Sequence, residues 1–201
     1  MIDMIRALLD SLAVSFDLPI LDWIAANLWC PFLDVVMPII TMFGDAGIFW
    51  IAVSVLLMIT KKYRKTGLGM AFALIMGLLV CNIYLKPTVA RIRPYDFQLK
   101  YFGKEIQLLA GAMHDFSFPS GHTIASFEAC TALMLGDKKL GIPATILAIL
   151  IAFSRLYLYV HYPTDVIASV ILGSLFGLIG FWLAGKCNLR NPFKKGNYEN
   201  K

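Results

Sequence analysis

Five long apolar runs dominate this chain of 201 residues and constrain its fold more than any other feature. A helix needs about 20 residues to cross a bilayer, and only helices and closed barrels satisfy their backbone groups there. The runs are continuously apolar rather than alternating, which favours helices over a barrel. The sequence therefore predicts an all-α, polytopic transmembrane helix bundle with five spans. These spans are expected at residues 45–60, 67–85, 122–136, 140–158 and 164–185.

Composition supports a lipid environment for these runs. Hydrophobic residues make up 59% of the chain and charged residues 15%, whereas soluble domains are about half apolar and about a quarter charged. The formal net charge of +5 would suit a nucleic-acid partner, but the basic residues fall at the ends of apolar runs, as membrane flanks do. We therefore expect the bilayer and no nucleic acid as partner, and the sequence leaves the oligomeric state open.

The first 43 residues form a less regular segment. Residues 17–43 mix large apolar side chains with aspartates, and Pro31 interrupts them. A mixed pattern broken by proline predicts two short amphipathic helices in an interfacial or re-entrant segment. A sixth span over residues 20–43 is the alternative, because an apolar run of this length can just cross a bilayer. In either case residues 1–201 are expected to form a single membrane-embedded domain.

Basic residues are divided unequally between the two sides of the predicted bundle. The positive-inside rule places the richer side, which follows the first, third and fifth runs, in the cytoplasm. The loop over residues 86–121 and the connection over residues 155–163 then face outward, and residues 186–201 form a cytoplasmic basic tail. The richer side carries Lys61, Lys62, Arg64, Lys65, Lys138, Lys139, Lys186, Arg190, Lys194, Lys195 and Lys201.

Three polar clusters lie at the ends of runs on the predicted outer side, where polar residues are costly and often functional. In the first cluster Lys86 ends the second run, and Pro94 favours an extended conformation for Arg93. Both cations can turn toward one anion. The simpler interpretation is that long basic side chains at a helix end reach for the membrane surface.

The second cluster opens the third run with Ser120, Gly121 and His122. Serine is a favoured helix N-cap, and glycine permits close approach of the backbone. Because unpaired N–H groups at the start of a helix bind phosphate, this cluster predicts an anion site with an imidazole beside it. A plain N-cap with an interfacial histidine explains the same residues equally well.

The third cluster brackets the turn between the last two runs with Arg155, His161 and Asp165. Pro163 suits the first turn of the last helix, which puts Asp165 close to His161. A carboxylate in this position fixes the imidazole tautomer and leaves the other ring nitrogen free to attack. The arrangement follows the logic of a catalytic triad with histidine as nucleophile. A surface His–Asp pair is the alternative.

Together the clusters resemble the signature of the type 2 phosphatidic acid phosphatase superfamily, which also includes the vanadium haloperoxidases. That signature is Lys-x6-Arg-Pro, then Pro-Ser-Gly-His, then Ser-Arg-x5-His-x3-Asp. Every position is filled in this chain, and three spaced motifs in order are far more specific than any one of them. The matching residues are Lys86, Arg93, Pro94, Pro119, Ser120, Gly121, His122, Ser154, Arg155, His161 and Asp165.

The resemblance implies a role for each residue. His161 is similar to the nucleophile that becomes phosphohistidine, and Asp165 to its orienting carboxylate. His122 is similar to the acid that protonates the leaving lipid oxygen. The cationic groups would take the place of a metal ion, so the resemblance implies no metal and no cofactor. The residues that would bind the phosphate oxygens are Lys86, Arg93, Ser120, Gly121 and Arg155.

The resemblance implies an integral protein of a bacterial plasma membrane that hydrolyses a lipid phosphate or diphosphate. Candidate substrates are undecaprenyl diphosphate, phosphatidylglycerol phosphate and phosphatidic acid, and family analogy slightly favours a polyprenyl diphosphate. Transfer of the phosphoryl group to another lipid acceptor would use the same residues. A channel or transporter is a third hypothesis, but it requires polar residues deep within the spans, and here they gather at one end.

Two further groups of residues have plain interpretations. His114 and Asp115 precede the second cluster and are expected to be a solvated loop pair rather than residues at the mouth of the site. Tyr157, Tyr159 and Tyr162 are expected to belong to an aromatic belt at the membrane interface.

Overall fold

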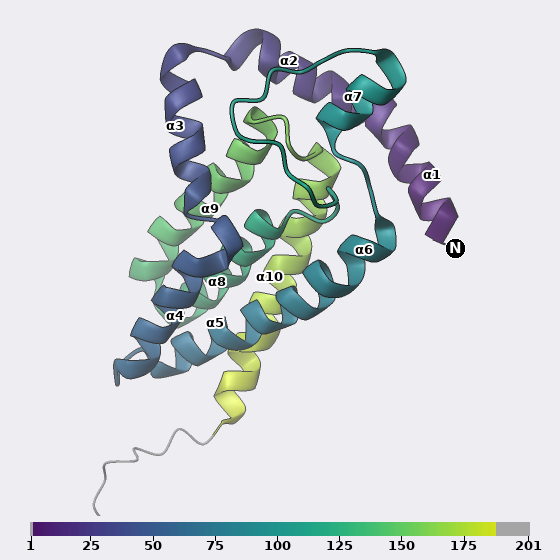
Figure 1. The fold of residues 1–201 in the computed structure, drawn as a ribbon. Coiled ribbons are helices and arrows are strands. Elements are labelled where there is room, and N and C mark those ends of the chain that lie inside the picture. Colours follow the sequence, from purple (N-terminus) through teal and green to yellow (C-terminus); the bar gives the residue numbers. More distant parts are fainter. Residues whose placement is uncertain (1, 188–201) are drawn as a thin grey trace, which may run out of the picture.

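The computed structural model describes residues 2–187, and every element assigned within them is a helix, which confirms the predicted all-α fold (Figure 1). The helices are α1 (Ile2–Leu12), η1 (Ala13–Asp17), α2 (Leu18–Leu28), α3 (Pro31–Met42), η2 (Asp45–Gly47), α4 (Ile48–Ile59), α5 (Arg64–Gly77), η3 (Leu78–Leu85), α6 (Lys86–Val89), α7 (Pro94–Phe102), α8 (Gly121–Gly136), α9 (Lys138–Tyr157) and α10 (Pro163–Lys186).

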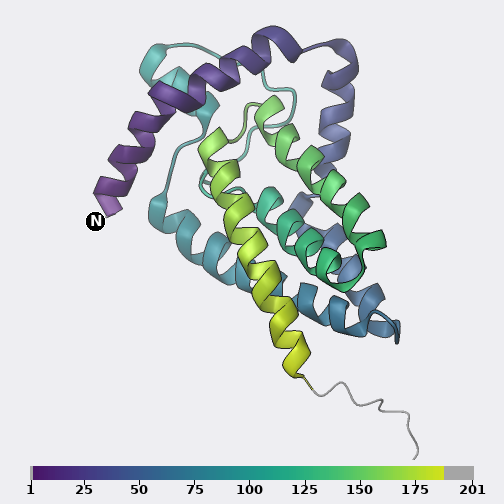
Figure 2. The same ribbon diagram turned by 180° about the vertical axis from the view of Figure 1, so that it is seen from behind.

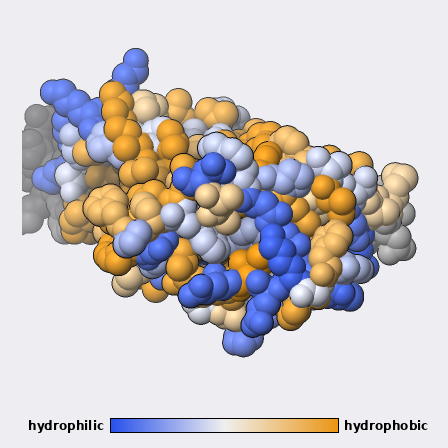
Figure 3. All heavy atoms as spheres, turned by 90° about the horizontal axis from the view of Figure 1, so that it is seen from above, coloured by the Kyte–Doolittle hydropathy of each residue, from blue (hydrophilic) through white to orange (hydrophobic). Residues whose placement is uncertain are grey.

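An N-terminal layer lies across one end of the bundle. Helices α1 and α2, joined by the π-helical segment η1, form one continuous but bent helix that ends at Leu28, and α3 then turns down toward α4 (Figures 1 and 2). The expected helix break at Pro31 is therefore present, and Pro31 is the first residue of α3. Figure 3 looks onto this end and shows hydrophilic residues mixed with hydrophobic ones.

Helix α8 lies in the middle of the bundle, in contact with α5, α9 and α10. The contact with α10 depends on two glycines four residues apart. A Cβ at Gly173 would lie 2.7 Å from the carbonyl oxygen of Ile124, and one at Gly177 would lie 2.8 Å from that of Glu128. Small residues at this spacing let two helix backbones approach closely, as they do in membrane helix pairs.

Four helical stretches within residues 2–187 are long and apolar enough to cross a membrane. Helix α8 has only 16 residues and is not among them. The large apolar side chains on the outer faces of the bundle are exposed, as lipid-facing side chains would be, for example Ile146, Ile171 and Trp182. The total of five or six spans stays a prediction. The four stretches are Pro31–Ile59, Arg64–Phe102, Lys138–Tyr157 and Pro163–Lys186.

The basic segments that sequence assigns to one side also meet in space. Lys62, in the turn after α4, lies 3.8 Å from the Asp137 carboxylate between α8 and α9. Lys65, at the start of α5, stacks on the ring of Phe181 near the end of α10, with 4.5 Å between the ammonium nitrogen and the ring centre. These turns therefore lie at one end of the bundle, away from the N-terminal layer. Most of the expected basic tail over residues 186–201 lies outside the described residues.

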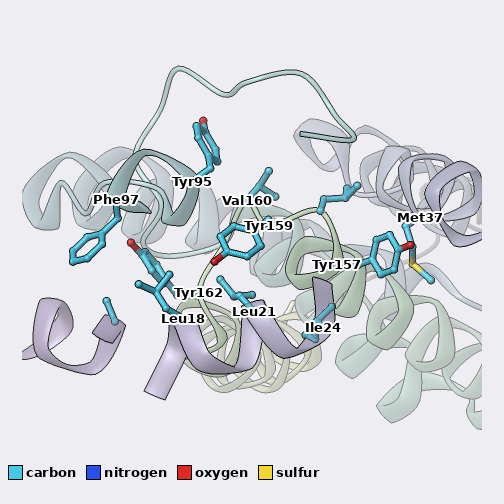
Figure 4. Packing of buried hydrophobic residues seen from close by; sticks show 12 residues of the cluster. Leu18, Leu21, Ile24, Met37, Tyr95, Phe97, Tyr157, Tyr159, Val160 and Tyr162 are labelled. Atoms are coloured by element: carbon cyan, nitrogen blue, oxygen red, sulfur yellow. The ribbon is translucent and has the colours of Figure 1, made fainter. Parts of the chain in front are cut away.

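The expected aromatic belt is wrong for three tyrosines. Tyr157, Tyr159 and Tyr162 are buried beneath α2 in a cluster with Leu18, Leu21 and Ile24 (Figure 4). Hydrogen bonds satisfy the buried hydroxyl groups of two of them. The hydroxyl of Tyr157 donates to Asp34 at 2.6 Å, and that of Tyr159 donates to Asp22 at 2.9 Å. Aspartates of the N-terminal helices therefore satisfy phenols that would otherwise need water.

Candidate active site

A cavity of about 430 Å³ runs along α8 between α4, α5 and η3. Its polar part is lined by Lys86, Arg93, Asp115, His122 and His161. The rest is mostly apolar, and it reaches from His122 to Glu128, six residues later on the same helix. At a rise of 1.5 Å per residue this is about 9 Å along the helix axis. The three clusters named from sequence therefore contribute to one site with an apolar extension.

The two cations of the first cluster share one carboxylate. Lys86 Nζ and Arg93 Nη2 each lie 2.5 Å from an oxygen of Asp115, and Arg93 Nε donates to the Asp115 carbonyl at 2.9 Å. Burial alone would raise the pKa of Asp115, but the hydrogen bonds and charges of Lys86 and Arg93 hold it well below its usual range. Asp115 is a loop residue whose side chain is 53% exposed, but it is not merely solvated as expected. It lines the cavity and pairs with both cations.

His161 lies between a cation and a carboxylate. Its Nε2 is 3.3 Å from Arg93 Nη1, and its Nδ1 is 3.5 Å from Asp165 Oδ2, too far for a hydrogen bond. A guanidinium can only donate, so the geometry favours the tautomer with a lone pair on Nε2 and the proton on Nδ1. Burial, followed by the charges of Arg93 and Arg155, lowers the pKa of His161 well below its usual range. The ring is therefore neutral, with its lone pair directed toward the cations.

Asp165 is held by partners that sequence reasoning did not identify. Arg91 Nη1 donates to Oδ1 at 2.5 Å, and Ser117 Oγ and the Tyr162 N–H donate to Oδ2. Arg91 also donates to Asp17 Oδ2 at 2.8 Å. Arg91 falls inside the variable stretch of the first motif, and Asp17 is 148 positions from Asp165 in the numbering. Motif spacing cannot reveal such a long-range contact.

His122 has a separate carboxylate partner. Its Nε2 lies 2.7 Å from Asp45 Oδ1, in the short helix η2 where α3 and α4 are interrupted. The chain approaches the imidazole closely here, since a Cβ at Gly44 would lie 2.7 Å from His122 Cδ2. Ala46 adopts a left-handed conformation with φ 48°, which lets the chain turn at this point. Sequence reasoning treated Asp45 only as part of an apolar run.

The remaining signature residues occupy different places. Ser120 precedes α8 without a capping bond from its side chain, and its N–H donates to Ser169 Oγ at 2.8 Å. Gly121 lines the cavity. Arg155 is fully buried behind it, where Nη1 donates to Thr41 Oγ1 at 2.5 Å and Nη2 faces the Met113 sulfur at 3.2 Å. Among residues 2–187 its Nε has no hydrogen-bond partner.

This arrangement suits a tetrahedral anion. Two cations, a neutral imidazole with an available lone pair and a second imidazole all line one cavity. Positioning and charge stabilisation of this kind are what phosphoryl transfer requires. Within the part of the chain that the structure describes, no three His, Cys, Asp or Glu side chains group together as metal ligands.

A sequence model described as the PAP2 superfamily matches residues 66–189. The chain belongs to the PAP2 superfamily. The match covers well over half of the chain and includes all three motifs, so the resemblance inferred from sequence is confirmed. Curated relatives of this chain are phosphatases that act on membrane lipids.

Two curated relatives and one solved structure agree with this assignment. An undecaprenyl-diphosphatase of Sulfolobus acidocaldarius is 34% identical over 73% of this chain and 66% of its own length. Phosphatidylglycerophosphatase B of Bacillus subtilis is 32% identical over 69% of this chain and 63% of its own length. The chain thus spans just under two thirds of each relative. A crystal structure of a transmembrane PAP2 type phosphatidylglycerolphosphate phosphatase from Bacillus subtilis shares the fold, with a TM-score of 0.72 at 24% identity over 94% of this chain and 95% of that one.

Proposed function

We propose that this PAP2 protein hydrolyses a lipid phosphate or diphosphate at the outer face of the membrane, through a phosphohistidine and without a metal ion. The observation that carries the proposal is that His161, His122, Lys86 and Arg93 line one cavity whose remaining walls are largely apolar. A phosphate fits the polar part, and the lipid chain fits the apolar part. The candidate substrates are undecaprenyl diphosphate, phosphatidylglycerol phosphate and phosphatidic acid.

In the first step the substrate phosphate displaces the Asp115 carboxylate from Lys86 and Arg93. His161 Nε2 attacks phosphorus, a P–N bond forms, and the bond from phosphorus to the leaving oxygen breaks. The departing electron pair stays on that oxygen, which receives a proton from His122. Burial and the charge of Arg155 lower the pKa of His122 to about 4, and the negative charge of a bound phosphate raises it toward the protonated form that this step needs. For a diphosphate, the leaving oxygen belongs to the inner phosphate.

In the second step a water replaces the departed lipid. His122, now neutral, takes a proton from the water, whose oxygen attacks phosphorus while the P–N bond breaks. Inorganic phosphate leaves, and His161 and His122 return to their initial states. Throughout, the negative charge of Asp165, 3.5 Å from His161 Nδ1, favours the proton at that nitrogen and the positive charge that develops on the ring. Arg155 adds positive charge to stabilise the transferring group.

The proposed orientation rests on the distribution of charge. The basic turns at Lys61–Lys65 and Lys138–Lys139 lie at the end of the bundle opposite to the cavity's polar part, so the positive-inside rule directs the site outward and the C-terminus to the cytoplasm. Reporter fusions at the C-terminus that are active only in the cytoplasm test this orientation. Activity of a periplasmic reporter at the same position would contradict it.

The reaction is tested by phosphate release from a panel of lipid phosphates in detergent, with EDTA present. We expect turnover to survive EDTA and to be inhibited by vanadate, which resembles the transferring phosphoryl group. His161→Ala should lower turnover on the order of 10⁴-fold or more. Acid quenching of the wild type on radiolabelled substrate should trap an acid-labile, base-stable phosphoprotein that His161→Ala lacks.

Three outcomes bear against the proposal. Near-normal turnover of His161→Ala would remove the nucleophile assignment, and loss of activity in EDTA would remove the metal-independent mechanism. Product analysis with an added lipid alcohol separates hydrolysis from phosphoryl transfer. Phosphate bound to the added lipid, in place of free phosphate, would identify a phosphotransferase.

A further inference from the structure

A second polar group lies in the cavity, away from the phosphate site. Glu128 of α8 lines the apolar part, and its side chain is 1% exposed. Its Oε1 has no hydrogen-bond partner among residues 2–187, and no described Lys, Arg or His forms an ion pair with it. The proposed mechanism does not use this carboxyl group.

The bundle makes room for this side chain. Gly77 of α5 faces the carboxyl group so closely that a Cβ there would lie 2.0 Å from Oε1. On the other side, Gly177 of α10 lies against the Glu128 backbone. A buried polar atom without a partner is unfavourable, and polar residues inside membrane proteins usually serve a function. The missing partner is therefore expected to come from the occupant of the cavity.

We propose that Glu128 forms a subsite for the acyl linkage of a lipid phosphate, an ester or amide group a few bonds below the phosphate. This inference rests on the proposed function and specifies its substrate class. A carboxyl group that lacks a cation in an apolar cavity is neutral, and a neutral acid has one O–H to donate to a linkage carbonyl. An amide linkage also has an N–H that Oε1 can accept.

The subsite distinguishes two classes of lipid phosphate. Acylated lipids carry carbonyl groups between the phosphate and the hydrocarbon chains, whereas a polyprenyl chain carries no hydrogen-bonding group there. A polyprenyl chain in the cavity would leave the Glu128 carboxyl unpaired. Sites that bury a polar group select strongly against ligands that leave it unpaired. The subsite thus favours phosphatidic acid or phosphatidylglycerol phosphate over a polyprenyl diphosphate.

The wild-type protein provides the first test, without any substitution. The substrates are a diacyl phosphatidic acid and its dialkyl ether analogue, which share chain length and phosphate and differ in the two carbonyl groups. We expect kcat/KM for the diacyl lipid to exceed that for the dialkyl lipid by roughly tenfold, the effect of one hydrogen bond to a buried group. Equal values would overturn the subsite.

Substitutions at Glu128 provide the second test. Glu128→Met keeps the length of the side chain and removes both polar oxygens, so the diacyl-to-dialkyl ratio should fall toward one. Glu128→Gln keeps a donor and an acceptor and should retain most of the preference. Leu74→Met, in the same cavity, is the matched control and should leave the ratio at its wild-type value.

The outcomes separate this inference from the function on which it rests. If the wild type releases phosphate from lipids but Glu128→Met keeps the wild-type ratio, the subsite is wrong and the phosphatase remains. If Leu74→Met changes the ratio as much as Glu128→Met does, the preference reflects cavity shape and the subsite is again wrong. If the wild type hydrolyses no lipid phosphate at all, the proposed function fails first, and the inference fails with it.

Discussion

Two histidine–carboxylate pairs face the same cavity, and they are built differently. Asp165, beside His161, is completely buried and is held by Arg91, Ser117 and the Tyr162 backbone. Asp45, beside His122, belongs to a short helix at a break between α3 and α4, and its side chain is 56% exposed. One carboxylate is fixed by the protein interior, and the other lies at the protein surface.

This difference matches the two chemical roles proposed for the imidazoles. A nucleophile needs a single orientation and a neutral ring, and a buried, fully bonded carboxylate supplies a fixed neighbour for it. A group that gives a proton to a leaving oxygen and then takes one from water needs access to both. The comparison therefore predicts that changes to the buried carboxylate and its partners will be costly and that changes to the exposed carboxylate will be mild.

Among changes to the two carboxylates and their partners, the largest effect is expected from Asp165→Asn. The amide has the same shape as the carboxylate but cannot stabilise the proton on His161 Nδ1, so kcat should fall by about 10³ to 10⁴-fold. The measurement is phosphate release under saturating lipid, with thermal unfolding in detergent as a check that the fold is kept. A loss of less than tenfold in a folded protein would show that Asp165 does not orient the nucleophile.

Arg91→Gln should have the next largest effect, mainly on stability. The substitution leaves the buried carboxylates of Asp17 and Asp165 without their shared cation, and breaking a buried ion pair typically costs about 3 to 5 kcal/mol. The free energy of unfolding in a denaturing detergent titration measures this loss. Arg91→Lys retains the charge and should recover part of both the stability and kcat.

The matched control for Arg91→Gln is a substitution in an exposed ion pair that also involves the N-terminal layer. Lys104 pairs with Asp22 of α2 at 2.8 Å, and both side chains are about half exposed. Lys104→Gln should change the free energy of unfolding by no more than about 1 kcal/mol. If the two substitutions destabilise the protein equally, burial does not distinguish the pairs and the comparison loses its physical basis.

The sequence predicts the signature residues of this site but misses the residues that pair with them. Apolar runs and three motifs predict the helical class and the convergence of His122 and His161, because antiparallel helices bring their ends together. The partners Asp45 and Asp115 lie outside the signature, and Arg91 occupies a position that the signature leaves variable. Their contacts depend on tertiary packing of segments distant in sequence, and neither periodicity nor motif spacing encodes such packing.

Burial was the second property that the sequence did not reveal. Tyrosines beside a helix end are typical of an interfacial belt, yet Tyr157 and Tyr159 are covered by α2. The N-terminal segment was expected to be interfacial, and its aspartates accept hydrogen bonds from these phenols. The burial of these tyrosines could not be inferred, because the sequence does not show where the N-terminal helices pack on the bundle.

Asp45→Asn should have a small effect on the exposed side. The Asp45 side chain is 56% exposed, and an ion pair with an exposed partner contributes at most about 1 kcal/mol, so kcat should fall by less than tenfold. His122→Ala, in contrast, should lower kcat by about 10² to 10⁴-fold, with a smaller loss for a substrate whose leaving group needs no proton. If Asp45→Asn is as damaging as Asp165→Asn, the two pairs are equivalent and the contrast between them is wrong.

The smallest expected effect is a shift in pH dependence that reports on the nucleophile itself. Burial and the positive charges of Arg93, Arg155 and Lys86 lower the pKa of His161, so the reactive neutral ring persists as the pH falls below about 6.5, the ordinary pKa of histidine. The acid limb of kcat/KM from His161 should therefore lie below that pH.

Lys86→Gln removes one positive charge and should move the limb to higher pH. The lipid phosphate also ionises in this range. The wild type and Lys86→Gln must therefore be compared on the same lipid, so that the ionisation of the free substrate is identical and a shift of the limb comes from the protein. An unchanged limb would mean that the cations near His161 do not control its protonation.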